Sequence, residues 1–252
     1  MSDFFRNLFN SDKGSLEITL FSLWHIMYIV LIVGLTSLVA YLIKDKSEDF
    51  KKKVIKWYAI AALGVYVADF FIMPLYMDRI DIDKLPFHIC TLMAPFAVVT
   101  SISDKCKAIR TPVAVLSLVS SLMYLTYPGS AIGGISPFVY KVVQTFLFHG
   151  LMFGFGFISI STKTVVLDFK KIWKELVFLC GIAVWAWFGN TVYYDLGPFD
   201  WFFITGSTFP FVPKVLMPFC VIIAIFAMVK IRVMPLKSFM MTSRMGVGSM
   251  PR

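Results

Sequence analysis

The chain alternates long apolar runs with short polar connections. Seven runs have lengths near the roughly 20 residues that an α-helix needs to cross about 30 Å of hydrocarbon. They are expected at residues 20–43, 54–76, 86–103, 111–126, 138–161, 172–194 and 211–233. Proline and glycine mark the connections, as in TYPGSAIGGISP at residues 126–137. The pattern therefore predicts an all-α, polytopic membrane helical bundle of about seven transmembrane helices.

Composition supports a membrane protein. Of the 252 residues, 58% are hydrophobic and only 15% are charged, whereas soluble domains carry about 25% charged residues. The net charge of +9 does not indicate a nucleic-acid partner, because the basic residues lie in short loops between apolar runs. Residues 1–14 contain no apolar core of the kind found in a cleavable signal peptide. The four cysteines show no disulfide pattern.

The distribution of lysine and arginine predicts the orientation. Eighteen of the 24 lie in the loops at 44–53, 104–110 and 162–171, in the adjoining helix ends and in the C-terminal tail. By the positive-inside rule, the N-terminus is expected outside and the C-terminus in the cytoplasm of a cell-membrane protein. We divide the chain into an extracytoplasmic segment with an interfacial helix (1–19), a seven-helix domain (20–233) and a basic cytoplasmic tail (234–252).

Polar side chains inside the spans are candidates for function, because such groups are costly in hydrocarbon. His25, Asp69, Cys90 and Asn190 are expected about 7–10 Å below the outer surface, and His149 about 16 Å below it. Lys141, Thr145 and His149 share one helix face, with Gln144 beside them, and Asn190 and Tyr194 share another. The pattern predicts a polar cavity that opens to the outside and is lined by spans one, two, three, five and six.

The third span opens with PFHICTLMAPF at residues 86–96. Pro86 suits the first turn of a helix, whereas Pro95 favours a kink within the span. Cys90 could serve as a nucleophile if a neighbouring base activated it, or it could simply pack. His88 could line the cavity or only cap the helix. His25, His88, Cys90 and His149 lack the spacing of a metal site, so we predict neither metal nor cofactor.

Three stretches carry a resemblance to a known family: LPFHICTL (85–92), FLFHGLMFGFG (146–156) and WAWFGNTVYYDLGPFDWFFI (185–204). They resemble the YwaF-like family of bacterial integral membrane proteins. That family is similar to the eukaryotic transmembrane protein 164 acyltransferases and, more distantly, to the androgen-induced intramembrane hydrolases. The resemblance implies a multi-pass helical fold in which a cysteine or threonine and an embedded histidine move or cleave lipid acyl chains. Carried over, Cys90 matches the nucleophile and His149 the histidine.

Three hypotheses follow. The first is a lipid acyltransferase or hydrolase with a Cys90 thioester, in which His149 is the base, Asp69 orients a histidine and Asn190 holds the oxyanion. The cavity would bind a lipid or other amphiphile through His25, His88, Gln144, Asn190 and Tyr194. The second is a small transporter or solute-binding protein with a 3+1+3 helix arrangement, suggested by the similar stretches at 86–96 and 210–219. The third is a structural or regulatory scaffold. Membrane lipids are the expected partners, and the oligomeric state stays open.

Overall fold

The computed structural model describes residues 17–72, 82–129, 131–133 and 135–196, together with residues 74, 201 and 223. The long helices in this part of the chain are α2 (Leu23–Ile43), α3 (Glu48–Ile72), α5 (Ile89–Ile102), α6 (Lys107–Thr126), α7 (Tyr140–Ser161) and α8 (Trp173–Val192). Short 3-10 turns connect them: η1 (Ile82–Lys84), η2 (Asp104–Cys106), η3 (Phe169–Lys171) and η4 (Tyr194–Leu196). The described residues form no strand beyond an isolated bridge between Ile18 and Ile135, which confirms the all-α class.

The first six predicted runs each overlap one of these helices. Five helices are long and apolar enough to cross a membrane, and the sixth, α5, is shorter, at 14 residues. The seventh run, apart from residue 223, lies outside the described residues, as do residues 1–16 and the C-terminal tail. The count of seven spans, the orientation of the termini, the interfacial helix and the 3+1+3 arrangement therefore stay predictions.

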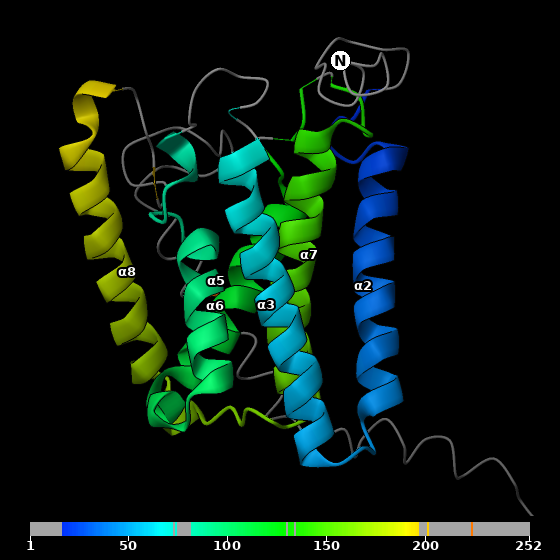
Figure 1. The fold of residues 1–252 in the computed structure, drawn as a ribbon, viewed down its shortest axis with the longest axis vertical. Coiled ribbons are helices and arrows are strands. Elements are labelled where there is room, and N and C mark those ends of the chain that lie inside the picture. Colours follow the sequence, from blue (N-terminus) through cyan, green and yellow to red (C-terminus); the bar gives the residue numbers. More distant parts are fainter. Residues whose placement is uncertain are drawn as a thin grey trace, which may run out of the picture.

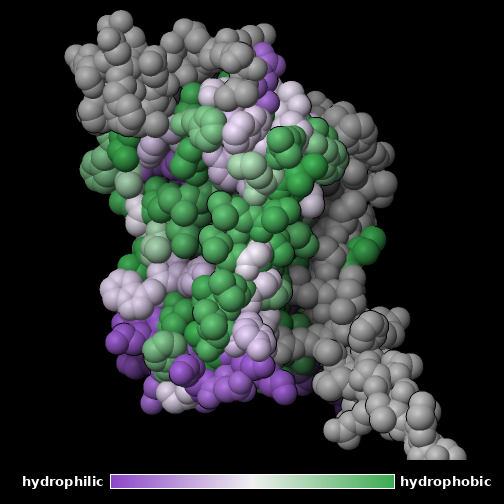
Figure 2. Space-filling model, turned by 90° about the vertical axis from the view of Figure 1, so that its right-hand side faces the viewer, coloured by the Kyte–Doolittle hydropathy of each residue, from purple (hydrophilic) through white to green (hydrophobic). Residues whose placement is uncertain are grey.

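The helices stand side by side, with α2 and α8 at opposite sides of the bundle (Figure 1). Helix α7 packs against α2, α3 and α6, while α5 fits between α3 and α6, and α8 rests on α6. Hydrophobic side chains cover the middle of the face seen in Figure 2, and hydrophilic ones gather at its lower edge. We call the end where α2 stops and α3 begins the basic end, and the opposite end the far end.

Helix α3 begins at Glu48, six residues earlier than the sequence pattern predicts. Glu48 and Asp49 occupy its first turn, where acidic side chains interact favourably with the helix dipole. Lys51 is buried and pairs with Glu48 at 2.8 Å. Charged residues at the basic end are therefore part of the helix and not of a loop.

Helix α5 begins deeper than predicted. It starts at Ile89 and not at Pro86, and in Figure 1 its first turn lies well below the far ends of α3 and α7. The preceding residues descend into the bundle, where the Trp185 indole donates a hydrogen bond to the Pro86 carbonyl at 2.9 Å. Phe87 is buried against Trp185 and Trp201, with ring centroids 5.1 and 4.7 Å away. Cys90 lies in the first turn of α5 and is therefore deeper in the bundle than the sequence predicted.

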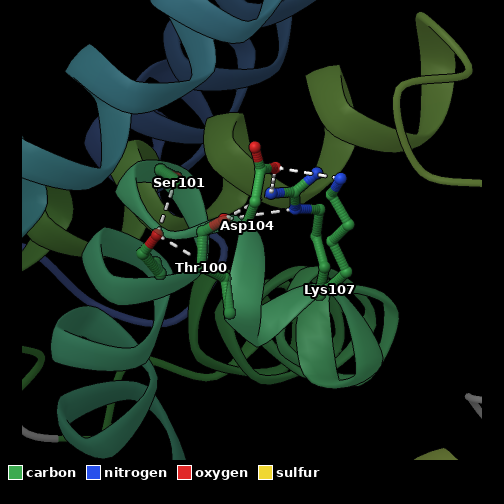
Figure 3. A network of polar contacts seen from close by, with 6 residues as sticks. Thr100, Ser101, Asp104 and Lys107 are labelled. Atoms are coloured by element: carbon green, nitrogen blue, oxygen red, sulfur yellow. Dashed lines mark hydrogen bonds and ion pairs between the residues drawn. The ribbon is translucent and has the colours of Figure 1, made fainter.

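The other end of α5 is fixed to α6 at the basic end (Figure 3). Arg110 donates two hydrogen bonds to the Thr100 carbonyl, at 3.1 and 2.9 Å, and so satisfies one of the carbonyls that the end of α5 leaves unpaired. Asp104 lies 3.3 Å from the Lys107 ammonium and 3.7 Å from Arg110. Helix α5 is thus anchored at both ends, by α8 at its start and by α6 at its finish, and this fixes the position of Cys90.

Candidate functional site

Cys90 is a free, partly buried cysteine in the first turn of α5. Its thiol lies against the hydroxyl of Ser120, which belongs to the neighbouring helix α6. His88 is the N-cap residue of α5, although its side chain makes no capping hydrogen bond. The sequence left open that His88 only caps the helix. It does occupy the N-cap position, but its side chain does not cap the helix.

The His149 side chain is buried in α7, with 8% of its surface exposed. Two contacts fix the orientation of its ring. Its Nδ1 lies 2.8 Å from the carbonyl oxygen of Thr145, one turn earlier in the same helix. Because a carbonyl can only accept, Nδ1 carries the proton and Nε2 is left as the basic nitrogen. The ring also stacks on Tyr124 of α6, with centroids 3.6 Å apart and an interplanar angle of 7°. His149 thus has the tautomer that a general base requires.

Helix α6 contacts both Cys90 and His149. Ser120, which touches the thiol, and Tyr124, which stacks on the imidazole, are four residues apart. Residues with this spacing lie on one helix face, about 6 Å apart along the axis. Cys90 and His149 therefore occupy successive turns of the same face of α6, despite the greater separation in depth that the sequence suggested.

Asp69 pairs with a lysine and not with a histidine. Its carboxylate is 2% exposed, and Oδ2 lies 2.9 Å from the ammonium of Lys84 in η1. This is an ion pair without hydrogen-bond alignment, and Oδ1 also has no hydrogen-bond partner among the described residues. Lys84 and His88 lie in the neighbourhood of His149. The sequence predicted that Asp69 orients a histidine. In the structure Asp69 instead pairs with Lys84.

Lys84 is held in place by α3 as well. The Tyr66 hydroxyl donates to the Lys84 backbone carbonyl at 2.7 Å, one turn of α3 before Asp69. Sequence reasoning missed this lysine because it lies in a polar connection. The available signal was its position as one of two basic residues between the second and third runs, beside a span that carries a buried carboxylate.

The structure places His25 and Asn190 in separate contacts. His25 is fully buried, accepts from the Phe21 N–H at 3.0 Å and donates through Nε2 to the Leu125 carbonyl at 2.8 Å. The Asn190 amide is bonded on both sides to the backbone of Trp201, each time at 3.0 Å. Both side chains therefore join segments of the chain, and the predicted oxyanion role of Asn190 stays a prediction.

The remaining predicted residues, Gln144 and Tyr194, lie in different parts of the structure. Gln144 is buried beside the site and accepts from the Thr145 hydroxyl at 3.2 Å. Tyr194 is 76% exposed in the described part of the chain, away from this cluster. No group of three potential metal ligands occurs among the described residues. Of these two residues only Gln144 lies on the helix that carries His149, and the cavity shared by all these side chains stays a prediction.

Sequence reasoning also missed the serines of α6. SLVSSLMY at residues 117–124 places three serines and Tyr124 at helical spacing. Because serine is small, it does not interrupt an apolar run. The helical spacing of these residues was therefore the only signal in the sequence. Ser120 contacts the thiol, as described above, while Ser117 and Ser121 are fully buried.

Comparison with known proteins now fixes the family. The model of the TMEM164 family matches residues 20–236, which include all but the first and last segments of the chain. No curated protein and no solved structure matches. The match covers well over half of the chain and agrees with the apolar helices of the bundle. The chain therefore belongs to the TMEM164 family and is a multi-pass membrane protein.

Proposed function

We propose that the protein is a membrane-embedded acyltransferase or hydrolase that acts on lipid esters through Cys90 and His149. One observation carries the proposal: His149 presents its basic nitrogen from a ring stacked on Tyr124, one helical turn from the serine that touches the Cys90 thiol. A nucleophile, a base and a group that orients the base form the arrangement used in covalent acyl transfer. Here the orienting group is the Thr145 carbonyl.

The reaction would proceed in two steps. His149 Nε2 takes the thiol proton as the Cys90 sulfur attacks the carbonyl carbon of the ester. The carbon–oxygen bond of the ester then breaks, and the imidazolium returns its proton to the leaving alkoxide. The products are a Cys90 thioester and an alcohol. In the second step, water or the hydroxyl of another lipid attacks the thioester, transfers its proton through His149 and releases the thiol.

The surroundings suit a lipid ester more than a water-soluble one. The site lies between helices whose outer surfaces are apolar, as in the central band of Figure 2. Lys84 brings a cation to the same cluster from the far end of the bundle, with its side chain 24% exposed. A polar head group at that end and acyl chains along the helices would match this distribution. The far end would face outward if the positive-inside prediction holds.

Acyl transfer can be tested by capture of the thioester. Purified protein in detergent is incubated with a phospholipid whose acyl chain carries an alkyne tag, and the protein-bound tag is measured before and after treatment with hydroxylamine. We expect a hydroxylamine-sensitive adduct that Cys90→Ala abolishes. Cys180→Ala, which alters an exposed cysteine on α8, is the matched control and should leave the adduct unchanged. Equal labelling of wild type and Cys90→Ala would exclude this function and leave the transporter hypothesis as the next to examine.

A further inference from the structure

The serine face of α6 lies where α5 and α7 meet. Successive residues of an α-helix are about 100° apart, so Ser117, Ser121 and Tyr124 fall within roughly 60° of one another. On one side of this arc lies Ser120, which faces Cys90 of α5. On the other lies Leu118, which packs against Gly156 of α7. Ser117 and Ser121 therefore point into the seam between the helix that carries the thiol and the helix that carries His149.

The hydroxyls of Ser117 and Ser121 are unpaired. Buried serine and threonine hydroxyls in helices commonly donate to a carbonyl three or four residues earlier. Thr100, Ser159 and Thr162 do so here, at 2.9, 2.6 and 2.7 Å. Ser117 and Ser121 are 0% exposed, yet neither has a hydrogen-bond partner among the described residues. An unpaired buried hydroxyl is destabilising, so two of them in one seam call for a reason.

We infer that Ser121 and Ser117 form the oxyanion site for acyl transfer at Cys90, an inference that rests on the proposed function. When sulfur attacks the ester, the carbonyl oxygen gains a negative charge and requires hydrogen-bond donors. The two hydroxyls donate to it and keep their protons throughout, and the charge disappears when the carbon–oxygen double bond reforms. Ser121 lies in the same turn as Ser120, between the levels of Cys90 and His149, and is the primary donor. Ser117, one turn nearer the basic end, is the second.

Two observations favour these serines over other donors. The Asn190 amide, the donor that the sequence suggested, is oriented toward the Trp201 backbone by two hydrogen bonds. The Ser120 hydroxyl touches the thiol itself and donates weakly to the Ser117 carbonyl at 3.4 Å. Ser117 and Ser121 are thus the hydroxyls in the seam that remain available for a substrate oxygen.

The test compares two reactions of the same thiol. Acylation of Cys90 by p-nitrophenyl butyrate passes through an oxyanion, whereas alkylation by iodoacetamide displaces iodide directly and forms no oxyanion. We expect Ser121→Ala to slow acylation by about 100-fold, as expected for loss of an oxyanion donor, with the alkylation rate within twofold of wild type. Ser117→Ala should show the same pattern with a smaller effect. Ser159→Ala, which removes a buried hydroxyl already paired within α7, should leave both rates unchanged.

The outcomes separate this inference from the proposed function. If wild type is acylated at Cys90 but Ser117→Ala and Ser121→Ala are acylated equally fast, the oxyanion site is refuted while the thioester mechanism stands. If wild type forms no thioester, the proposed function fails first. Parallel losses of acylation and alkylation in Ser121→Ala would indicate a disturbed thiol and would count against the inference. Ser121→Thr, which keeps a hydroxyl donor at this position, should be acylated faster than Ser121→Ala if the inference is correct.

Discussion

Gly156 tests how closely α6 and α7 must approach to form the site. It lies seven residues after His149, two turns nearer the basic end of α7. A Cβ added there would meet the Ala114 carbonyl oxygen at 2.5 Å and Leu118 backbone and side-chain atoms at 2.8 and 2.7 Å. Ordinary contacts need about 3.5 Å, so α6 would have to withdraw by about 1 Å. Because the obstacle is largely backbone, no side-chain rotation can relieve it.

The expected magnitude follows from a matched substitution. Overpacking of this kind costs about 1–3 kcal/mol, while replacement of a helical glycine by alanine contributes about 1 kcal/mol in the opposite direction. Gly64→Ala in α3 gives the helical gain alone, since nothing lies within 4 Å of its added Cβ. The two variants should therefore differ in the free energy of unfolding by about 1–3 kcal/mol, with Gly156→Ala the less stable.

Thermal unfolding in detergent, followed by tryptophan fluorescence, measures the stability difference, and acylation of Cys90 by p-nitrophenyl butyrate measures the site. Withdrawal of α6 would loosen the stack of His149 on Tyr124, now 3.6 Å. We expect Gly156→Ala to lose both stability and acylation rate relative to Gly64→Ala. Equal stability and equal rates in the two variants would refute the close packing of α6 and α7.

Three further predictions concern single side chains. His149→Gln should slow Cys90 acylation by about 100- to 10,000-fold, as expected for loss of a general base, which stopped-flow release of p-nitrophenol would measure. Asp69→Asn should lower the free energy of unfolding by about 1–3 kcal/mol, less than for a fully buried pair because Lys84 is partly exposed; Lys84→Gln in the same chain should restore part of the loss, and no restoration would argue against the ion pair. Asn190→Ala removes both hydrogen bonds that this side chain makes to the Trp201 backbone and should destabilise the protein by about 2 kcal/mol or more in thermal unfolding. Thr191→Ala, at an exposed hydroxyl that bonds within its own helix, should have little effect.

The helices were predictable because their signal is local. Length and hydropathy located six of the runs, with ends that differ from the observed helices by a few residues. The position of Asp69 and His149 within apolar spans likewise identified both as candidates for function. Two glycines of α7 lie at close helix contacts, since Gly150 faces Ile32 of α2 and Gly154 faces Tyr58 of α3.

The partners of the polar groups were not predictable, since they come from distant parts of the chain. The start of α5 depends on Trp185, nearly 100 residues after Pro86, and hydropathy holds no information about that hydrogen bond. Asn190 is occupied by the backbone of a residue eleven positions later. The link between Cys90 and His149 is their shared contact with α6, whose serines do not stand out within an apolar run.

The most direct test of the account is whether Cys90 and residue 149 lie within reach of each other. In a chain whose other cysteines, Cys106, Cys180 and Cys220, are replaced by serine, His149→Cys adds a second thiol to Cys90. A short bifunctional methanethiosulfonate reagent is applied in detergent, and the linked peptides are quantified by mass spectrometry. Leu147→Cys, at an exposed position of α7, is the control. The account predicts efficient linkage to Cys90 in His149→Cys and little in Leu147→Cys; equal or absent linkage in both would contradict it.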